Sequence, residues 1–262
     1  MRCSHGENIM TSIEKLLKTS VYAFVQKHHY SQVLPRLTKV CLGCRDEAGD
    51  IAAVCTLGYG VRPVHTIAKA FPGLGTADYF EIGKLCLRED MPKNSESWFL
   101  SKIIKWLKQE APTVKLLYTW ADGILGKPGY IYQAANFYYG GYITTETYIN
   151  NEGNKVHPRS MQGLSEEGGT GKRNSRALAV TEAMGYIKYW GKQFRYVYPL
   201  CSNSEWEAIR MTSPFEWERK DYPKDIDCTW KRQTLAGIED VLEIPFTRGT
   251  YTNKSKLQER LF

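Results

Sequence analysis

The sequence lacks the features that would place it in a membrane or outside the cell. No apolar run reaches the length that crosses a bilayer, and the N-terminus has no apolar segment of the kind found in signal peptides. The seven cysteines are odd in number and accompany no secretion signal, so they predict a reduced compartment and no disulfide framework. We therefore expect a soluble cytoplasmic protein with no membrane partner.

Residues at metal-binding spacing are also scarce. Cys41 and Cys44 form a lone CxxC with no second pair at zinc spacing, which predicts two buried thiols that act as small hydrophobic side chains. Five histidines are present, and their spacing reveals no ligand cluster such as a two-histidine carboxylate motif. The sequence predicts no metal site, although iron-assisted chemistry stays open.

Apolar residues are plentiful enough for a sizeable core. Hydrophobic residues make up 42% and aromatic residues 13% of the 262 residues, which excludes a largely disordered chain. The apolar pattern between residues 79 and 149 predicts a strand, a helix, a strand, a short helix and a strand. These elements are expected at residues 80–87, 97–109, 114–120, 131–139 and 141–149, with Gly140 and Gly141 ending the short helix.

Three further elements are readable outside this region. A hairpin is expected at residues 39–60 and a short helix at residues 204–211. A first helix is expected to end at His29 and Tyr30, with one packed face. The apolar residues of that face are Ile13, Leu16, Leu17 and Phe24.

The order of the elements and the segment IYQAANF resemble the core of the GNAT acyltransferase fold. Tyr132 stands five residues before Phe137, the spacing at which the GNAT tyrosine protonates the departing thiolate of coenzyme A, and Asn136 takes the place of the usual glycine. The GNAT cofactor loop is glycine-rich so that backbone N–H groups approach a pyrophosphate, whereas residues 90–97 contain no glycine. The resemblance implies an α/β fold of GNAT-like type, with a mixed central sheet flanked by helices.

A narrower resemblance rests on several segments. They are His28-His29-Tyr30, PKNSES at 92–97, Ala121-Asp122 after a strand, IYQAANF, HPRS at 157–160 and GKQFRYVYPL at 191–200. Over roughly the first three quarters of the chain, these segments resemble the Mom family of phage DNA-modification proteins. The resemblance implies an enzyme that converts the N6 amine of adenine in DNA into a carbamoylmethylated amine, which shields phage DNA from host restriction.

That chemistry needs a flipped and oriented base together with a proton acceptor, because the N6 lone pair is delocalised into the ring. Asp122, at the carboxyl end of a strand, is expected to accept the proton, and its alternative role is to cap the following loop. Tyr132 is expected to supply or stabilise a proton. His29 and Tyr30 are expected in the site, with His28 as the alternative bearer of this role and a helix-end contact as the structural alternative.

The donor is expected to bind where the helix of residues 97–109 opens. Asn94, Ser95 and Ser97 are typical capping residues there, and Ser97 is the first candidate for a catalytic contact with the donor. Tyr59 is expected to line the pocket, with a packed strand edge as the alternative. The transferred CH2–CO–NH2 unit and the adenine nitrogen together have the skeleton of glycinamide, which indicates a glycine-derived donor such as glycyl-tRNA. An acyl-CoA stays open, although acyl transfer alone would give an amide.

Charge points to a nucleic-acid partner. The formal net charge is +7, and residues 155–195 hold eight Lys and Arg against three Glu, a local excess of +5. Double-stranded DNA is the expected partner, with tRNA as a second anionic partner if it carries the donor. A solvated surface loop is the alternative interpretation. The residues expected to contact DNA are Arg159, Lys192, Arg195 and Tyr196.

We expect a GNAT-like catalytic domain at residues 1–200 with a basic insertion near 151–176. Residues 201–262 are expected to form an extension packed on that domain, because tryptophans and a phenylalanine recur there. Two other functions stay open, an N-acetyltransferase that uses acetyl-CoA and a noncatalytic DNA-binding protein. The sequence determines neither which DNA sequence context is recognised nor the oligomeric state.

Overall fold

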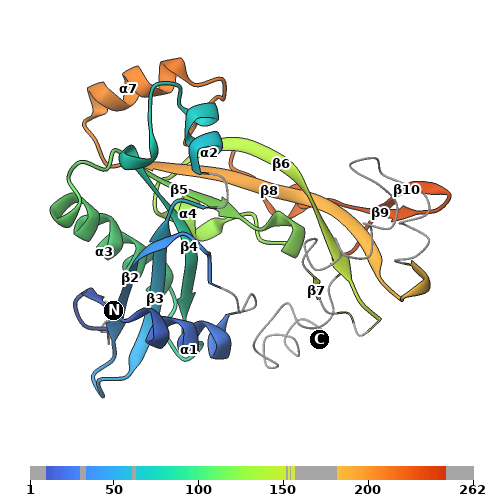
Figure 1. Ribbon diagram of the computed structural model, residues 1–262, viewed down its shortest axis with the longest axis horizontal. Helices are drawn as coiled ribbons and strands as arrows, with labels where there is room; N and C mark the ends of the chain where they lie inside the picture. The colour runs from blue at the N-terminus through green and yellow to red at the C-terminus, as the bar shows by residue number, and fades with distance from the viewer. Residues whose placement is uncertain are drawn as a thin grey trace, which may run out of the picture. The chain divides into compact units, whose positions relative to one another are not determined.

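The computed structural model describes residues 10–29, 34–60, 63–151, 153, 155, 156 and 182–245 (Figure 1). The chain forms two compact units. The first unit comprises Met1–Trp120, Tyr130–Gly141 and Arg195–Tyr222, and the second comprises Ala121–Gly129, Tyr142–Phe194 and Pro223–Phe262. Strands β6 (Tyr138–Ile149) and β8 (Ile187–Pro199) pass from one unit into the other. The expected boundary at residue 200 stays a prediction, and most of the expected basic insertion lies outside the described residues.

The first unit is built on a mixed sheet. Its strands are β1 (Glu14–Lys15), β2 (Thr38–Arg45), β3 (Ile51–Gly58), β4 (Tyr79–Leu87) and β5 (Leu116–Ala121), paired in this order and followed by β8 and β6. Neighbours from β1 to β4 are antiparallel, whereas β4 and β5 are parallel. The parallel pairing joins only residues 79–81 to residues 116–118. The two strands therefore part after Glu81 and Tyr118.

Five α-helices accompany this sheet in the described part of the first unit. They are α1 (Lys18–His28), α2 (Pro63–Ala70), α3 (Ser95–Glu110), α4 (Tyr130–Ala134) and α7 (Asn203–Thr212), with a short 3-10 helix, η1, at Thr76–Asp78. The order β4-α3-β5-α4-β6 confirms the predicted GNAT-like α/β arrangement. The predicted hairpin and the helix near residue 204 are also confirmed.

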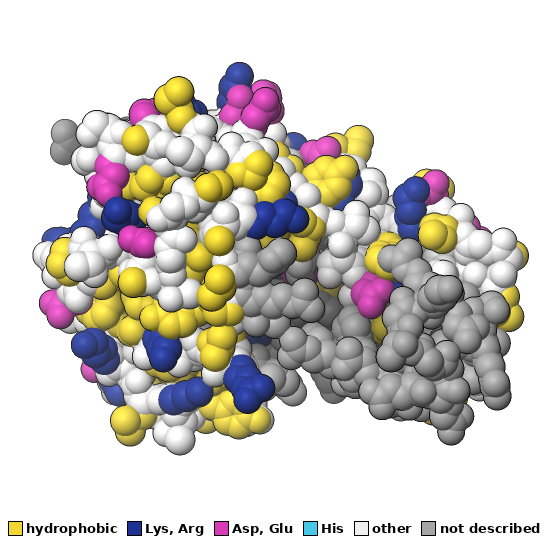
Figure 2. Space-filling model, turned by 45° about the horizontal axis from the view of Figure 1, so that its top comes forward, with side chains coloured by type: hydrophobic (Ala, Val, Ile, Leu, Met, Phe, Trp, Pro, Cys, Tyr) yellow, Lys and Arg dark blue, Asp and Glu magenta, His cyan; other side chains and the backbone are white. Residues whose placement is uncertain are grey.

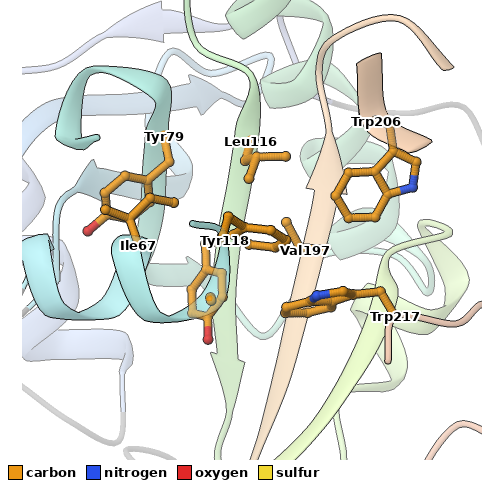
Figure 3. Packing of buried hydrophobic residues seen from close by; sticks show 9 residues of the cluster. Ile67, Tyr79, Leu116, Tyr118, Val197, Trp206 and Trp217 are labelled. Atoms are coloured by element: carbon orange, nitrogen blue, oxygen red, sulfur yellow. The ribbon is translucent and has the colours of Figure 1, made fainter. Parts of the chain in front are cut away.

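Two apolar clusters form the core of the first unit. In one, Val21, Phe24 and Val25 of α1 pack on β2, β3 and β4. In the other, Tyr118 and Val197 lie between the two tryptophans, Trp206 and Trp217, and the pair of Tyr79 and Ile67 of α2 (Figure 3). Both indoles are 1% exposed, so burial of these large rings contributes strongly to the stability of this unit.

The start of the first helix differs from the prediction. Helix α1 begins at Lys18, and residues 14–15 instead form β1, paired with Leu42 and Gly43 of β2. The Leu16 N–H donates to the Cys41 carbonyl, which holds this segment against the sheet. Leu17 is 75% exposed, so the apolar run that ends there is not the face of a helix.

The short helix before β6 also ends earlier than predicted. Helix α4 stops at Ala134, and residues 138–141, expected in the helix or at its glycine stop, belong to β6. Asn136 adopts a left-handed conformation with φ of 59°, which a helix cannot continue through. The stop signal is therefore Asn136, and the two glycines lie within a strand.

The described part of the second unit is mostly strands and short 3-10 turns. Besides its parts of β6 and β8, it contains η2 (Gly123–Leu125), β7 (Lys155–Val156), η5 (Asp225–Asp227), β9 (Trp230–Thr234) and β10 (Gly237–Val241). Strand β9 pairs with both β8 and β10, and β7 pairs with β6. The Trp230 indole donates a 2.8 Å hydrogen bond to the Ile124 carbonyl, which fixes η2 against β9.

The cysteines behave as predicted from their spacing. Cys41 and Cys44 are buried free thiols on β2, and the Cys44 thiol lies 3.3 Å from the sulfur of Met10. Burial raises the pKa of Cys44 to about 12, so this thiol stays protonated. None of the described helices is long and apolar enough to cross a membrane.

Candidate active site

The loop before α3 presents a polar helix start. Asn94 is exposed at the N-cap position with φ of 73°, and its side chain makes no capping hydrogen bond, because the left-handed backbone differs from the extended backbone of a capping residue. The Ser97 hydroxyl donates a 2.9 Å hydrogen bond to the Asn94 carbonyl. Ser95 is buried, and its N–H donates to the Pro92 carbonyl. The structure thus brings Asn94 and Ser97 together and assigns Ser95 to packing.

Tyr132 lies near the end of α4, which packs against α3. The Phe137 N–H donates to the Tyr132 carbonyl and the Asn136 N–H donates to the Gln133 carbonyl, the bonding pattern of a Schellman motif. The Tyr132 and Phe137 rings are 5.4 Å apart, which adds the hydrophobic contact of that motif. Tyr132 and Phe137, five residues apart, therefore have a structural role in ending helix α4. This role exists in addition to any role of the Tyr132 hydroxyl.

Arg195 and Tyr196 are interior residues of the first unit. Tyr196 is fully buried and its hydroxyl accepts a 3.1 Å hydrogen bond from the Gln133 amide, while burial raises the pKa of Tyr196. Arg195 is 6% exposed, donates to the Gly140 carbonyl at 2.8 Å and stacks on the Phe215 ring at 3.8 Å. Both side chains thus have packing partners inside the unit, which favours a structural role over the expected contact with DNA.

His29 ends α1 as predicted. It occupies the C-cap position, is 8% exposed, and its N–H donates to the Val25 carbonyl. The His28 ring lies 4.6 Å from the Phe24 ring. Burial lowers the pKa of His28, and nearby Lys27 and Arg88 lower it further, so the imidazole is neutral at neutral pH.

Tyr59 follows β3 and is partly buried. Its ring stacks on the Phe80 ring at 6.0 Å, and the Lys39 ammonium lies 5.6 Å from its centroid. Its carbonyl accepts a 2.6 Å hydrogen bond from the Tyr79 hydroxyl. These contacts hold the Tyr59 ring in place. A fixed ring is compatible with both expected roles, lining a pocket and packing at the edge of the sheet.

In the second unit, Asp122 and Lys192 are neighbours. The Gln193 amide donates a 3.3 Å hydrogen bond to the Asp122 carboxylate, and the Lys192 carbonyl is so close to Gly123 that a Cβ there would lie 2.8 Å from it. The Asp122 side chain makes no capping bond to η2, since its backbone carbonyl accepts the N–H groups of the turn. The capping role considered for the carboxylate is therefore performed by the backbone.

Two residues of this region were not singled out from the sequence. Gln193 orients the Asp122 carboxylate from β8, and Tyr142 of β6 is 51% exposed with the Lys192 ammonium 4.7 Å from its ring centroid. Lysine held over an exposed aromatic ring is a combination that binds both a phosphate and a base. Gln193 lies between Lys192 and Phe194 in the segment GKQFRYVYPL. Its place in this segment is the sequence feature from which a role for Gln193 could have been predicted.

Two predicted residues, Tyr30 and Arg159, lie outside the described residues. Within the described part of the chain, no group of three or more His, Cys, Asp or Glu side chains has the arrangement of a metal site.

The mixed sheet, the polar start of α3 and the end of α4 define a protein of the GNAT-like α/β class. The chain belongs to the Mom protein family, whose sequence profile matches residues 11–224. It is similar to the methylcarbamoylase mom of Escherichia phage Mu, with 27% identity over 176 residues that cover 65% of this chain and 72% of that protein.

Solved GNAT structures resemble the chain more distantly. The Escherichia coli N-acetyltransferase YhbS, solved in complex with CoA, is 10% identical with a TM-score of 0.35, over 48% of this chain and 67% of that chain. The ribosomal-protein-S18-alanine N-acetyltransferase of Escherichia coli is 12% identical with a TM-score of 0.37, over 74% and 95%.

Proposed function

We propose that this protein transfers a carbamoylmethyl group to N6 of adenine in duplex DNA and so protects phage DNA from host restriction. The observation that carries the proposal is membership of the Mom family over residues 11–224, together with the similarity to the methylcarbamoylase of phage Mu. The arrangement of polar side chains within each unit is compatible with this chemistry.

The second unit supplies groups suited to DNA. The exposed Tyr142 ring offers a stacking surface, and Lys192 beside it offers a cation for a phosphate. The Asp122 carboxylate, oriented by Gln193, accepts a hydrogen bond from the N6 amine and takes its proton as the new N–C bond forms. Arg159 is proposed as a further phosphate contact.

The first unit supplies groups suited to the donor. Ser97 and Asn94 at the start of α3 offer a hydroxyl and an exposed amide, with Ser95 supporting the turn and Tyr59 lining the pocket. Tyr132 provides a proton to the group that leaves the donor's methylene carbon as that carbon bonds to N6, and His29 with Tyr30 completes the proposed site. The donor stays open between a glycine-derived species such as glycyl-tRNA and an acyl-CoA.

Replacement of Asp122 by alanine tests the proposal. Plasmid DNA from cells that express the wild-type protein is expected to contain an adenosine heavier by one carbamoylmethyl group, measured by mass spectrometry of its nucleosides. In Asp122→Ala this nucleoside is expected to fall by at least about a hundredfold, the contribution of a positioned general base. DNA binding is expected to stay within about twofold, since a carboxylate adds no attraction to phosphate.

The matched control is Asp240→Ala, which removes an exposed carboxylate of the same unit whose ion pair with Lys231 contributes little. Its modification level should equal that of the wild type. Unmodified adenine from folded, well-expressed wild-type protein would instead favour an acetyltransferase or a noncatalytic DNA-binding protein.

A further inference from the structure

Helix α3 has two different faces. Phe99, Ile103 and Leu107 are buried, on the side of the helix that contacts β4. A second stripe of side chains lies on the opposite side, since residues four, seven, eight and eleven positions apart share one side of an α-helix. This stripe consists of Trp98, Lys102, Lys105, Trp106 and Gln109. The buried face already anchors the helix, so the two tryptophans of the stripe can serve another purpose.

The stripe forms one wall of an open groove of about 450 Å3. Residues 10–13, at the start of the described chain, form the other wall beside α3 (Figure 1). All of these lining residues belong to the first unit. Trp98 and Trp106 are both partly exposed, and the eight positions between them correspond to about 12 Å along the helix axis. The groove therefore offers two aromatic surfaces at separate points along its length.

Each of the two rings has a cation beside it. The Lys102 ammonium lies 5.1 Å from the centroid of the Trp98 ring. The Lys15 ammonium, which comes from β1, lies 5.5 Å from the centroid of the Trp106 ring. Both distances are within the range of a cation–π interaction, so the two lysines are held at the groove.

These cations are not neutralised by carboxylates in the part of the chain that the structure describes. Lys105 is a third exposed cation of the groove. No described carboxylate forms an ion pair with any of the three lysines, and the Glu14 carboxylate, next to Lys15 in the sequence, instead binds Arg45 at 2.6 Å. The groove is therefore electrostatically complementary to an anionic ligand.

Aromatic rings that alternate with lysines are the combination that binds an unpaired nucleic-acid strand, because bases stack on the rings while phosphates contact the cations. A duplex keeps its bases paired and stacked on one another, so it cannot offer them to the tryptophans. Thr11, Ser12 and Gln109 add two hydroxyls and an amide to the walls. Such groups can bond a 2′-hydroxyl, which favours RNA over DNA.

The groove begins next to the start of α3. Trp98 directly follows Ser97, the residue to which the proposed function assigns contact with the donor. An aminoacyl-tRNA carries its amino acid at the end of an unpaired strand, so a donor held at Ser97 would have that strand beside it. We infer that the groove binds the unpaired end of the tRNA that carries the donor, an inference that rests on the proposed function and selects the tRNA from its two donors.

Replacement of the tryptophans by leucine tests the groove. Leucine retains an apolar side chain but has no flat ring, so Trp98→Leu and Trp106→Leu should each bind a labelled single-stranded RNA of about eight nucleotides at least about fivefold more weakly. Tyr22→Leu is the matched control, because it removes an aromatic ring of the same unit that is 45% exposed on α1. Fluorescence anisotropy of the full chain gives the affinities.

Two other nucleic acids define the specificity of this effect. Duplex DNA, which the proposed function assigns to the second unit, should bind both tryptophan variants within about twofold of the wild type. Single-stranded DNA of the same sequence should lose less affinity than the RNA. An equal loss for RNA and duplex DNA would overturn the inference, and an equal or larger loss for single-stranded DNA would overturn the assignment to RNA.

The lysines are tested by the salt dependence of RNA binding. In Lys102→Gln and Lys105→Gln the slope of log K against log salt concentration should become shallower by about 0.7, the value for one phosphate contact of a single strand. Lys69→Gln, which removes an exposed lysine of α2 in the same unit, should leave the slope unchanged. Equal changes in all three variants would remove these lysines from the proposed contact.

DNA modification in cells separates the inference from the proposed function. If wild-type DNA carries the modified nucleoside, Trp106→Leu should lower its level at least about fivefold and Tyr22→Leu should not. Full modification by a variant that no longer binds RNA would overturn the inference alone. Unmodified wild-type DNA with RNA binding that depends on Trp106 would refute the proposed function and leave the groove as an RNA site. A changed oligomeric state with unchanged RNA affinity would assign the groove to a second copy of the chain and overturn the inference.

Discussion

At the scale of single residues, Asn136 links the sequence pattern to the structure. The usual glycine is absent at this position, yet the left-handed backbone that glycine would favour is present, with φ of 59°. Asparagine tolerates this conformation better than other residues with a Cβ because its short polar side chain bonds locally. The substitution therefore preserves the end of α4, and with it the position of Tyr132.

Substitution of Asn136 measures this conformational requirement. We expect Asn136→Ala to lower the free energy of unfolding by about 1 kcal/mol, because alanine has no local bond to offset a left-handed backbone. Asn136→Gly should be neutral or slightly stabilising. Urea unfolding of the variants provides the measurement, and equal stability of the alanine and glycine variants would contradict the explanation.

At the scale of elements, local signals were predictable from the sequence and long-range contacts were not. The hairpin of β2 and β3 has its turn close in sequence, and α3 shows its apolar spacing directly. Strand β1 depends on pairing with residues about thirty positions away, so its apolar neighbours looked like a helix face. In the site, Asp122 was visible at a strand end, whereas its partner Gln193 lies 71 residues away.

Gly140 and Gly141 look like the end of a helix in the sequence. The structure instead requires glycine at residue 140 because of a side chain that is far away in the sequence. A Cβ on Gly140 would collide with the Trp217 indole, while nothing lies within 4 Å of a Cβ on Gly141. Gly141 instead has φ of 79°. One glycine is thus required by packing and the other by backbone conformation.

Alanine at each position should separate these causes. We expect Gly140→Ala to destabilise the protein by about 3 kcal/mol through overpacking against Trp217. Gly141→Ala should cost only about 1 kcal/mol. The combination Gly140→Ala with Trp217→Phe should recover part of the first loss relative to Trp217→Phe alone, as measured by a double-mutant cycle of unfolding free energies. An additive cycle would disprove the proposed collision.

At the scale of the whole molecule, the feature that bears on a DNA partner is electric charge. On the face in Figure 2, Lys and Arg side chains are interspersed with Asp and Glu. The net charge of +7 nevertheless favours long-range attraction to DNA. Specific phosphate contacts such as that proposed for Lys192 should therefore be detectable as changes in salt dependence.

The salt dependence of DNA binding tests Lys192. In Lys192→Gln the slope of log K against log salt concentration should become shallower by about 0.9, the value for one lost phosphate contact. Lys231→Gln is the control, because Lys231 lies in the same unit and already faces Asp240. Fluorescence anisotropy with a duplex oligonucleotide gives both slopes, and identical changes in the two variants would remove Lys192 from the DNA contact.

The contact between Tyr132 and Phe137 also bears on ancestry. Because this pair closes a helix, selection for a folded chain alone would retain it after catalytic activity had been lost. A distant descendant that still carries tyrosine five residues before phenylalanine therefore records inheritance of an architecture. Inheritance of the reaction would be recorded instead by the proposed proton acceptor, Asp122, whose side chain makes no capping hydrogen bond to η2.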